Sequence, residues 1–423
     1  MGKTIAEKIF SRASGVKNIK AGDFVMARVD LHYNLESGMV EVHNKVVGAG
    51  LPQGLPKLAD PEKIAIMLGD HYGCHAKPKD ATDYKLSREL AKRYGIKKLY
   101  DINTGIAHVT VPEEGLARPG MLVCGKDSHA TTCGAVNALA TPVSAVETAW
   151  IYFTGELWFQ VPETVKFVCN GKLGDSVGAK DIFLYVIGKY TPSLAQYKSL
   201  EWKGSVIDAI GMDGRMTLAC QSIELGAKCA PFEPDSTCLE YVKSTLHAEE
   251  EFWPSSADSD AVYEMVYEED FSSLEPQVAL PHGFDIIRPV SDVEGIHIDQ
   301  CNLGSCANSR YEDIAEVARI VKGRKVKART IFSPGSWKVY RKALKSGLLE
   351  ILVDSGIMVM APSCLICVGG GASIADGEVA IAATTRNFRG RFGNPNSEIY
   401  LASPATVAAS AVIGKITDPR KLL

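Results

Sequence analysis

The sequence lacks the features that mark exported and membrane-spanning chains. Residues 1–12 carry charges throughout and contain no apolar core of the kind that a signal peptide needs. A long uncharged run, residues 356–375, approaches membrane length, but it contains Pro362 and a glycine triplet. We interpret this run as a buried strand and loop, and we expect a cytoplasmic protein with no membrane partner.

The sequence also lacks a strong excess of either charge. Lys and Arg number 46 against 50 Asp and Glu, a formal net charge of −4, and no basic block interrupts the chain. Because a nucleic-acid partner would require clustered positive charge, we expect none. The 423 residues suffice for two to four domains of roughly 100–200 residues each.

Eleven cysteines are scattered over the chain, an odd number that does not fit a disulfide framework. Secreted frameworks are short and dense in cysteine, whereas large intracellular enzymes keep buried thiols as small apolar side chains. We therefore expect a reducing compartment. Seven cysteines are interpreted as structural: Cys74, Cys124, Cys133, Cys169, Cys229, Cys238 and Cys301.

Three other cysteines, Cys306, Cys364 and Cys367, form a possible metal-binding set. Thiolates are the usual protein ligands of iron–sulfur clusters, and three of them would leave one iron of a 4Fe-4S cluster free as a Lewis acid. The C-x-x-C at 364–367 also occurs in zinc sites and redox pairs. The sequence has no second C-x-x-C, however, and a glycine triplet rather than a helix follows this one.

Apolar residues alternate between strand-like and helix-like spacing along most of the chain. This alternation predicts an α/β class with largely parallel sheets. Strands are expected within residues 21–30 and at 63–68, 98–101, 120–124, 165–168 and 326–332, and helices at 5–13, 87–94, 180–189, 216–225 and 311–321.

We expect three α/β domains, at residues 1–164, 165–275 and 276–423, the last of which carries the cysteine trio. The first boundary is placed where a new strand starts. An acidic stretch at residues 249–270 is expected to be a solvated surface segment.

Two of the predicted strands end in an acid and a histidine. Asp70-His71 follows residues 63–68, and Asp127-Ser128-His129 follows residues 120–124. Because open parallel sheets bind ligands at the carboxyl ends of their strands, we expect the chemistry at this edge.

Seven motifs together resemble those of the aconitase superfamily, and within it the large subunits of isopropylmalate isomerase and homoaconitase-like hydro-lyases. The resemblance covers the chain nearly from end to end, and the motifs are specific jointly rather than singly. They are Asp70-His71, Gly105-Ile-Ala-His108, Asp127-Ser128-His129, Glu224-Leu-Gly226, Gly304-Ser-Cys-Ala-Asn-Ser-Arg-Tyr-Glu-Asp313, Ser363-Cys364-x-x-Cys367 and Arg386-Asn-Phe-Arg-Gly-Arg391.

The resemblance implies three α/β domains around a central 4Fe-4S cluster held by Cys306, Cys364 and Cys367. The fourth iron, which no cysteine ligates, would bind the substrate. The implied reaction is the reversible dehydration of a small hydroxy di- or tricarboxylic acid. Such a reaction needs a Lewis acid, a proton donor for the leaving hydroxyl and a base for the neighbouring carbon.

Catalytic roles follow from the same resemblance. Imidazoles paired with carboxylates are held in one orientation and stabilised as cations. His71 with Asp70 would protonate the leaving hydroxyl, and Ser128 would contact the substrate or an iron-bound water. The remaining pairs would be His108 with Asp127 and His129 with Glu224.

Arg386 and Arg391 would bind substrate carboxylates through their forked guanidinium groups. For an isolated arginine pair, surface salt bridges are the simpler interpretation. The surrounding Asn-Phe-x-Gly-Arg motif favours substrate binding.

The family's carbon base is a serine on a smaller swivelling domain, in a Gly-Ser-Ser-Arg-like loop. This sequence contains no such loop. We therefore expect a separate small subunit to supply the serine, so that the active site lies between two chains.

Several positions beside the motifs depart from the family pattern and indicate a divergent branch. Threonine is usual at Ala130 and Ala307, and asparagine is usual at Cys220 and Thr385. These changes remove hydrogen-bonding groups near the expected cluster. The substrate therefore need not be isopropylmalate: homoaconitase and citramalate- or dimethylmalate-type dehydratases are alternatives. A non-catalytic iron or redox sensor and a structural zinc protein are alternatives from other classes.

Overall fold

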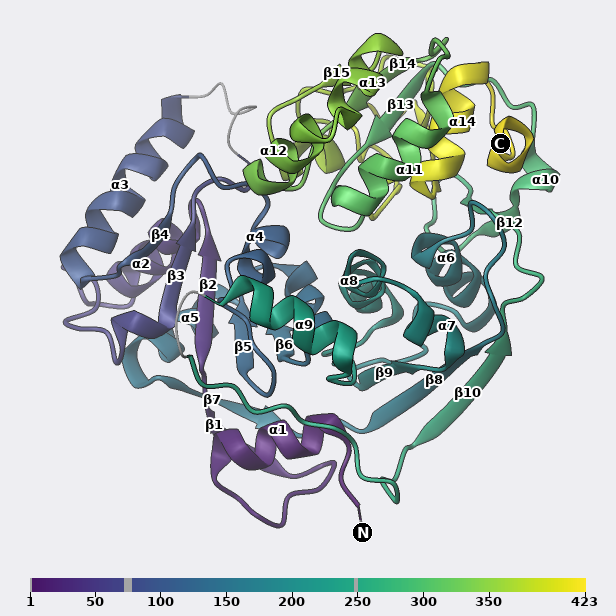
Figure 1. Cartoon of the computed structure of the whole chain (residues 1–423). Coiled ribbons are helices and arrows are strands. Elements are labelled where there is room, and N and C mark those ends of the chain that lie inside the picture. Colours follow the sequence, from purple (N-terminus) through teal and green to yellow (C-terminus); the bar gives the residue numbers. More distant parts are fainter. Residues whose placement is uncertain (1, 72–77, 247–249) are drawn as a thin grey trace.

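The structure, a computed structural model, describes residues 2–71, 78–246 and 250–423. Its described part contains four sheets, with helices packed around them (Figure 1). Most strand pairs are parallel, so the expected α/β class is confirmed.

A five-stranded parallel sheet carries the first group of candidate residues, in the order β4-β3-β2-β5-β6. Its strands β3 and β5 are apolar and buried along their whole length, as expected when helices cover both faces of a parallel sheet. The strands are β2 (Leu31–Leu35), β3 (Ile64–Met67), β4 (Lys98–Tyr100), β5 (Leu122–Gly125) and β6 (Leu139–Pro142). The helices of this region are α2 (Gly38–Gly48), α3 (Pro78–Tyr94), α4 (Ala107–Glu113) and α5 (Ala145–Thr154).

A small antiparallel ribbon joins the start of the chain to its middle. β1 (Phe24–Arg28) pairs with β7 (Glu156–Gln160), next to helix α1 (Ile5–Ser14). Strand β7 was not predicted. It lies between α5 and the strand expected at residues 165–168.

A three-stranded parallel sheet, in the order β10-β8-β9, follows. Its outer strand β10 lies within the acidic stretch, where residues 265–270 pair with β8, and none of residues 250–270 is buried, so this part of the stretch is on the surface as expected. Residue 249, at the start of that stretch, lies outside the described residues. The strands are β8 (Thr164–Asn170), β9 (Ser199–Lys203) and β10 (Met265–Asp270), and the helices are α6 (Ala179–Tyr190), α7 (Ser205–Ala209), α8 (Met212–Gln221) and α9 (Ser236–Thr245).

The last sheet has seven strands in the order β12-β11-β17-β16-β13-β14-β15. Pairing is parallel from β17 to β15, and β11 is antiparallel to both of its neighbours. The strands are β11 (Gln277–Ala279), β12 (Ile287–Pro289), β13 (Gln300–Leu303), β14 (Arg329–Phe332), β15 (Met358–Val359), β16 (Val379–Ala382) and β17 (Glu398–Ala402). The helices are α10 (Val290–Val293), α11 (Tyr311–Val321), α12 (Trp337–Lys345), α13 (Leu348–Asp354) and α14 (Pro404–Ile413).

The uncharged run at residues 356–375 is not the buried strand and loop that we expected. Only the two residues of β15 are extended, at the edge of the sheet, and several positions of the run are exposed. None of the helices within the described ranges is long and apolar enough to cross a membrane.

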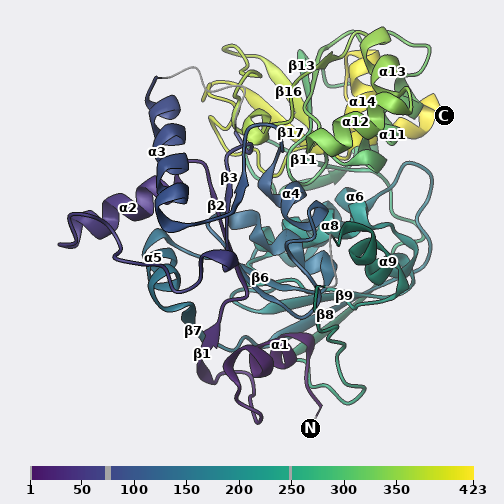
Figure 2. The ribbon, with the colours of Figure 1, turned by 60° about the vertical axis from the view of Figure 1, so that its left-hand side comes forward.

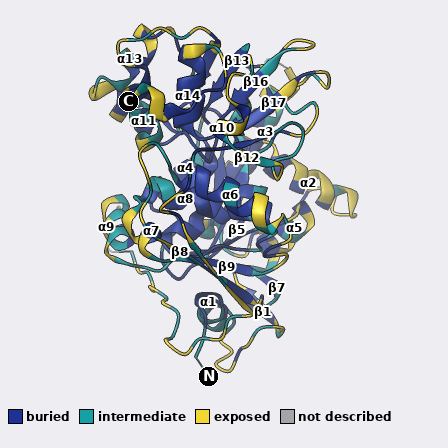
Figure 3. Ribbon diagram, turned by 90° about the vertical axis from the view of Figure 1, so that its right-hand side faces the viewer, coloured by how far each residue is buried: buried dark blue, intermediate teal, exposed yellow. Residues whose placement is uncertain are grey.

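Helices α4 and α8 occupy the middle of the molecule. Figures 1 and 2 both place them between the seven-stranded sheet and the five- and three-stranded sheets. Most residues of both helices are buried, as Figure 3 shows. The candidate site lies around these helices. The division at residues 164 and 275 remains a prediction.

Candidate active site

The predicted acids and histidines follow the strands to which the sequence assigned them. Asp70 and His71 come directly after β3, and Asp127 comes after β5. Asp127 then caps a 3₁₀ helix, Ser128–Val136, because its carboxylate accepts a hydrogen bond from the backbone N–H of His129 at 3.0 Å. The cap fixes the backbone that presents His129.

Cys306 stands on a tight loop after β13. Gly304 has φ +138°, and a Cβ there would lie 2.6 Å from the carbonyl oxygen of Ser333, so only glycine fits. Ser305 has φ +88°, an uncommon conformation for a residue with a side chain. Such conformations persist where the surrounding structure enforces them, often at functional sites.

Cys364 and Cys367 lie on a 3₁₀ helix, Cys364–Val368, which Ser363 caps by accepting a hydrogen bond from the backbone of Leu365. The backbone N–H of Cys364 donates to the carbonyl of Asp70 at 2.7 Å. The cysteine helix is therefore attached directly to the strand end that carries His71.

The three predicted cluster cysteines lie together, with Cys220 beside them. Cys220 Sγ lies 3.6 Å from Cys306 Sγ, and Cys364 is close enough to Cys306 to shift its pKa. The contact with Cys220 lowers the pKa of Cys306, but the contact with Cys364 and burial raise it by more, to well above its ordinary value.

Cys367 contacts two polar side chains. Its sulfur lies 3.2 Å from Thr385 Oγ1 and accepts a hydrogen bond from Arg391 Nη2 at 3.4 Å. Burial alone would raise the pKa of this thiol, but Arg391 and Thr385 lower it below its ordinary value. A gathered set of three thiols, one of them favoured as thiolate, has the donor chemistry that an iron–sulfur cluster requires.

His71 contacts two carboxylates. Its Nδ1 lies 3.2 Å from Asp70 Oδ2, as predicted, and 3.1 Å from Glu36 Oε2, which was not predicted. Burial alone would lower the pKa of His71, but the two carboxylates raise it to about 10. Burial raises the pKa of Asp70 to about 6. The imidazole is therefore a cation at neutral pH.

His108 and His129 have the carboxylate neighbours expected of them. His108 Nε2 lies 3.2 Å from Asp127 Oδ1, and His129 Nε2 lies 3.2 Å from Glu224 Oε1. Burial alone would lower the pKa of His129, but Cys220 and Glu224 raise it above its ordinary value. In Asp127, burial alone would raise the pKa, but the contacts with both histidines lower it well below its ordinary value.

The two predicted arginines lie in different surroundings. Arg386 donates from Nε to Glu224 Oε1 at 2.7 Å, and its Nη2 lies 3.5 Å from Ser128 Oγ. Arg391 contacts Cys367 and packs over the ring of Phe388. Arg386 is therefore beside the histidines, whereas Arg391 is beside a cysteine.

Three buried or half-buried residues of the site escaped prediction. Glu36 directly follows β2, so the strand-end argument could have found it. Arg310 donates to the carbonyls of Cys306 and His108 and so connects the loop of Cys306 to helix α4. Lys180, in the first turn of α6, donates to the carbonyl of Thr384 at 2.7 Å, and burial lowers its pKa to about 8. No sequence signal marked the lysine.

Two of the four departures from the family pattern contact the predicted cluster thiols, and the other two are buried alanines. Ala130 and Ala307 are fully buried. Cys220 contacts Cys306, and Thr385 contacts Cys367. Cys74, which the sequence analysis assigned a structural role, lies outside the described residues.

A cavity of about 460 Å³ opens beside His71. Its wall is polar and carries charges of both signs, with two lysines and four carboxylates, among them Asp80 and Asp83. Lining residues include Glu36, His71, Lys79, Lys126, Asp127 and Leu365.

Comparisons with known proteins identify the family of the chain. Residues 74–414 match the Aconitase family (aconitate hydratase). The chain is 42% identical to 3-isopropylmalate dehydratase large subunit 1 of Methanopyrus kandleri, over all of both chains. It is also 42% identical to the protein of the same name from Pyrococcus furiosus, over all of this chain and 99% of that one.

One solved structure has a fold similar to that of this chain. Aconitase X of Thermococcus kodakaraensis, in its holo form, superposes with a TM-score of 0.50 at 12% identity, over 90% of this chain and 89% of that one. The family match and the full-length relatives carry the assignment. The chain belongs to the aconitase family.

Proposed function

We propose that this chain is the large, catalytic subunit of a hydro-lyase that reversibly dehydrates a small hydroxy acid with two or three carboxylates. One observation carries the proposal: three imidazoles each lie 3.2 Å or less from a carboxylate, and two of them lie within 4.8 Å of an assigned ligand, His129 of Cys306 and His71 of Cys364. The names of the full-length relatives, 3-isopropylmalate dehydratase large subunit, support this class of reaction.

Cys306, Cys364 and Cys367 are assigned as the ligands of a 4Fe-4S cluster. When bound, a cluster with only three protein ligands supplies a Lewis acid that polarises the substrate hydroxyl. Arg391 stabilises the thiolate of Cys367, and the backbone hydrogen bond from Cys364 to Asp70 keeps the cysteine helix next to His71.

His71 is assigned as the acid that protonates the leaving hydroxyl. It lines the cavity, and its pKa of about 10 keeps it charged at neutral pH. Asp70 and Glu36 stabilise the charge and fix the ring through Nδ1, and Nε2 is assigned as the nitrogen that carries the transferable proton.

Arg386 and Ser128 are assigned to substrate carboxylate binding. Arg386 is fixed by its bond to Glu224, which also holds His129. A guanidinium held at one nitrogen retains its terminal N–H groups for a carboxylate. Arg391, because it already contacts Cys367, is assigned to the cluster side of the same pocket.

A second chain is needed to complete the site. The sequence has no Gly-Ser-Ser-Arg-like loop, and the relatives are named as large subunits. We therefore propose a small subunit that covers the cavity beside His71 and supplies a serine as the carbon base. Within the reaction class, isopropylmalate is the leading substrate, and homoaconitase-type and citramalate- or dimethylmalate-type acids are the alternatives.

The test is a turnover assay under exclusion of oxygen. The chain is purified with and without the small subunit encoded beside it, and each sample is assayed for hydration of a panel of unsaturated diacids. We expect turnover only when both chains are present. A fully loaded cluster with no turnover on any diacid would contradict the proposal and favour a sensor.

A further inference from the structure

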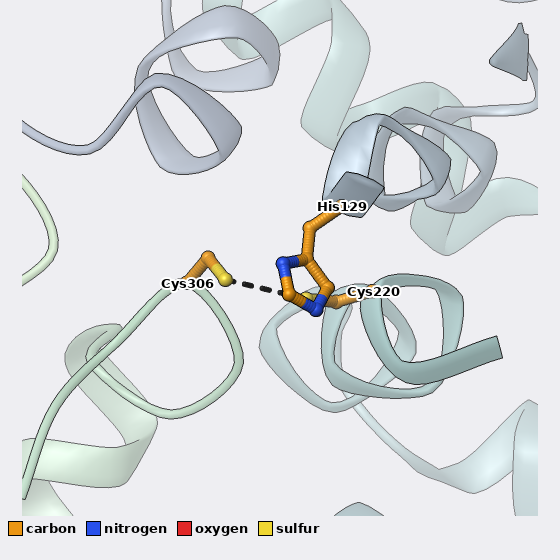
Figure 4. Close-up of side chains that lie close together, drawn as sticks. All are labelled: His129, Cys220 and Cys306. Atoms are coloured by element: carbon orange, nitrogen blue, oxygen red, sulfur yellow. Dashed lines mark hydrogen bonds between the residues drawn. The ribbon is translucent and has the colours of Figure 1, made fainter. Parts of the chain in front are cut away.

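Two thiols and an imidazole from three separate elements meet beside the predicted cluster site. Cys220 lies near the end of α8, Cys306 follows β13, and His129 lies on the 3₁₀ helix after β5. The candidate ligand atoms of the three side chains all lie within 4.8 Å of one another (Figure 4). Neither Cys220 nor His129 is a predicted ligand of the cluster.

The spacing of the two sulfurs suits a single metal ion. Two thiolates bound to a tetrahedral Zn²⁺ at about 2.3 Å each are roughly 3.8 Å apart. The observed distance from Cys220 Sγ to Cys306 Sγ is 3.6 Å. An ion could therefore bind both thiols with little movement of the chain.

The imidazole is oriented as metal-bound histidines usually are. His129 Nε2 contacts Glu224 Oε1 at 3.2 Å, and Arg386 holds the same carboxylate oxygen at 2.7 Å. Ligating histidines commonly give their second ring N–H to a carboxylate, which fixes the tautomer. Nδ1, which lies 3.8 Å from Asp127 Oδ1, is then the ring nitrogen that would bind the ion.

The charge balance also favours a dication. Cys220, Cys306 and His129 are all buried, and a net charge in such a place is costly. A divalent ion that displaces the protons of both thiols leaves a neutral unit of one dication, two thiolates and one neutral imidazole. Thiolate and imidazole donors are those that Zn²⁺ prefers.

We propose that His129, Cys220 and Cys306 form a second metal site, which binds one Zn²⁺ with a water as fourth ligand. Because Cys306 also belongs to the predicted cluster set, the single ion and the cluster exclude one another. The zinc-bound chain is then a form that cannot be loaded with iron and sulfide. The site does not depend on which acid the enzyme dehydrates, or on whether it turns over.

The experiment uses the full chain, freed of iron by a chelator, and Co²⁺ as a coloured probe in place of Zn²⁺. We expect one Co²⁺ per chain, with the intense d–d bands of tetrahedral coordination and a thiolate-to-cobalt absorption. Zn²⁺ should displace it. Absence of the tetrahedral bands would overturn the proposal.

Two variants separate this site from the cluster. Cys220→Asn should weaken Co²⁺ binding at least about tenfold, because even the loss of an outer partner of a metal ligand costs roughly 10- to 100-fold in affinity. It should still accept a cluster from added iron and sulfide. Cys364→Ala should lose the cluster and keep the Co²⁺ site. The reverse pattern would show that the ion binds the cluster cysteines and would overturn the assignment.

A competition experiment and a control for folding complete the test. One equivalent of Zn²⁺ added before iron and sulfide should block cluster assembly in the natural chain and have little effect in Cys220→Asn. Equal inhibition of both proteins would contradict a shared Cys306. Cys220→Ala serves as a second variant, and circular dichroism of each confirms that a lost signal is not lost folding.

Discussion

The carboxylate of Glu36 lies 3.1 Å from Nδ1 of His71. It also accepts a hydrogen bond from the backbone N–H of the same residue. Glu36 comes from the end of β2 and His71 from the end of β3, which are neighbouring strands. The acid of the proposed reaction is thus held at both its backbone and its ring by one side chain.

This contact predicts a change in pH dependence. Glu36 helps to raise the pKa of His71 to about 10, so activity that needs the cationic imidazole is present below that pH and lost as the pH rises through it. Glu36→Gln lowers the pKa, so the alkaline limb of the kcat profile should move to lower pH. Glu41→Gln, which removes a carboxylate paired with Lys126, should leave the limb in place. An unmoved limb in Glu36→Gln would contradict the role of Glu36.

The cysteine assignment predicts the loss of colour and activity together. Cys364→Ala should remove one of three cluster ligands, so the brown chromophore and the dehydratase activity should disappear in anaerobically reconstituted protein. Cys169→Ala, a buried cysteine in β8, should keep both. Retention of the chromophore in Cys364→Ala would show that the ligands are misassigned.

The position of Arg386 predicts a specific loss of substrate binding. Arg386→Lys keeps the charge but loses the forked geometry, and loss of a hydrogen bond to a charged group costs about 1.5–3 kcal/mol, or roughly 10- to 150-fold in kcat/KM. Arg389→Lys is the matched control, because Arg389 is exposed and bonds only a backbone carbonyl among the contacts resolved here. Equal kinetics for both variants would argue against carboxylate recognition by Arg386.

An ion pair between a buried arginine and a partly exposed aspartate predicts a stability effect away from the site. The guanidinium of Arg215, which is 1% exposed, donates two hydrogen bonds of 2.7 Å to Asp235. Asp235→Asn keeps an N-capping side chain for α9 but leaves the arginine without its counter-charge. Because the Asp235 side chain is 35% exposed, the loss is smaller than for a fully buried pair, on the order of 1–2 kcal/mol. Thermal unfolding should show a clearly lower Tm. Asp60 is another N-capping aspartate, so Asp60→Asn serves as the control and should change the Tm little. Equal Tm shifts in Asp235→Asn and Asp60→Asn would show that the loss comes from capping and not from the ion pair.

Local patterns predicted much of the fold. Apolar runs located β3, β5 and α11, and the α/β class follows from their alternation. The pairing of β1 with β7 and of β10 with β8 could not be predicted, because it joins segments far apart in the sequence. The run at residues 356–375 was misread because apolar composition alone does not distinguish a core strand from an edge loop.

The residues of the candidate site were likewise predictable only in part. Residues that follow a strand, such as His71 and Asp127, were found from the chain alone, and the structure brings them together. Lys180 and Arg310 act through contacts with distant backbone carbonyls, which no local pattern encodes. The contact between Cys220 and Cys306 joins two residues that only the folded chain makes neighbours.

Mössbauer spectroscopy of the full chain, loaded with ⁵⁷Fe under exclusion of oxygen, tests the central claim most directly. A 4Fe-4S cluster held by three cysteines should show one iron whose signal changes when a hydroxy acid binds, while the other three do not change. The account would be contradicted if the signals of all four irons stayed unchanged when the acid binds, or if the iron formed no cluster.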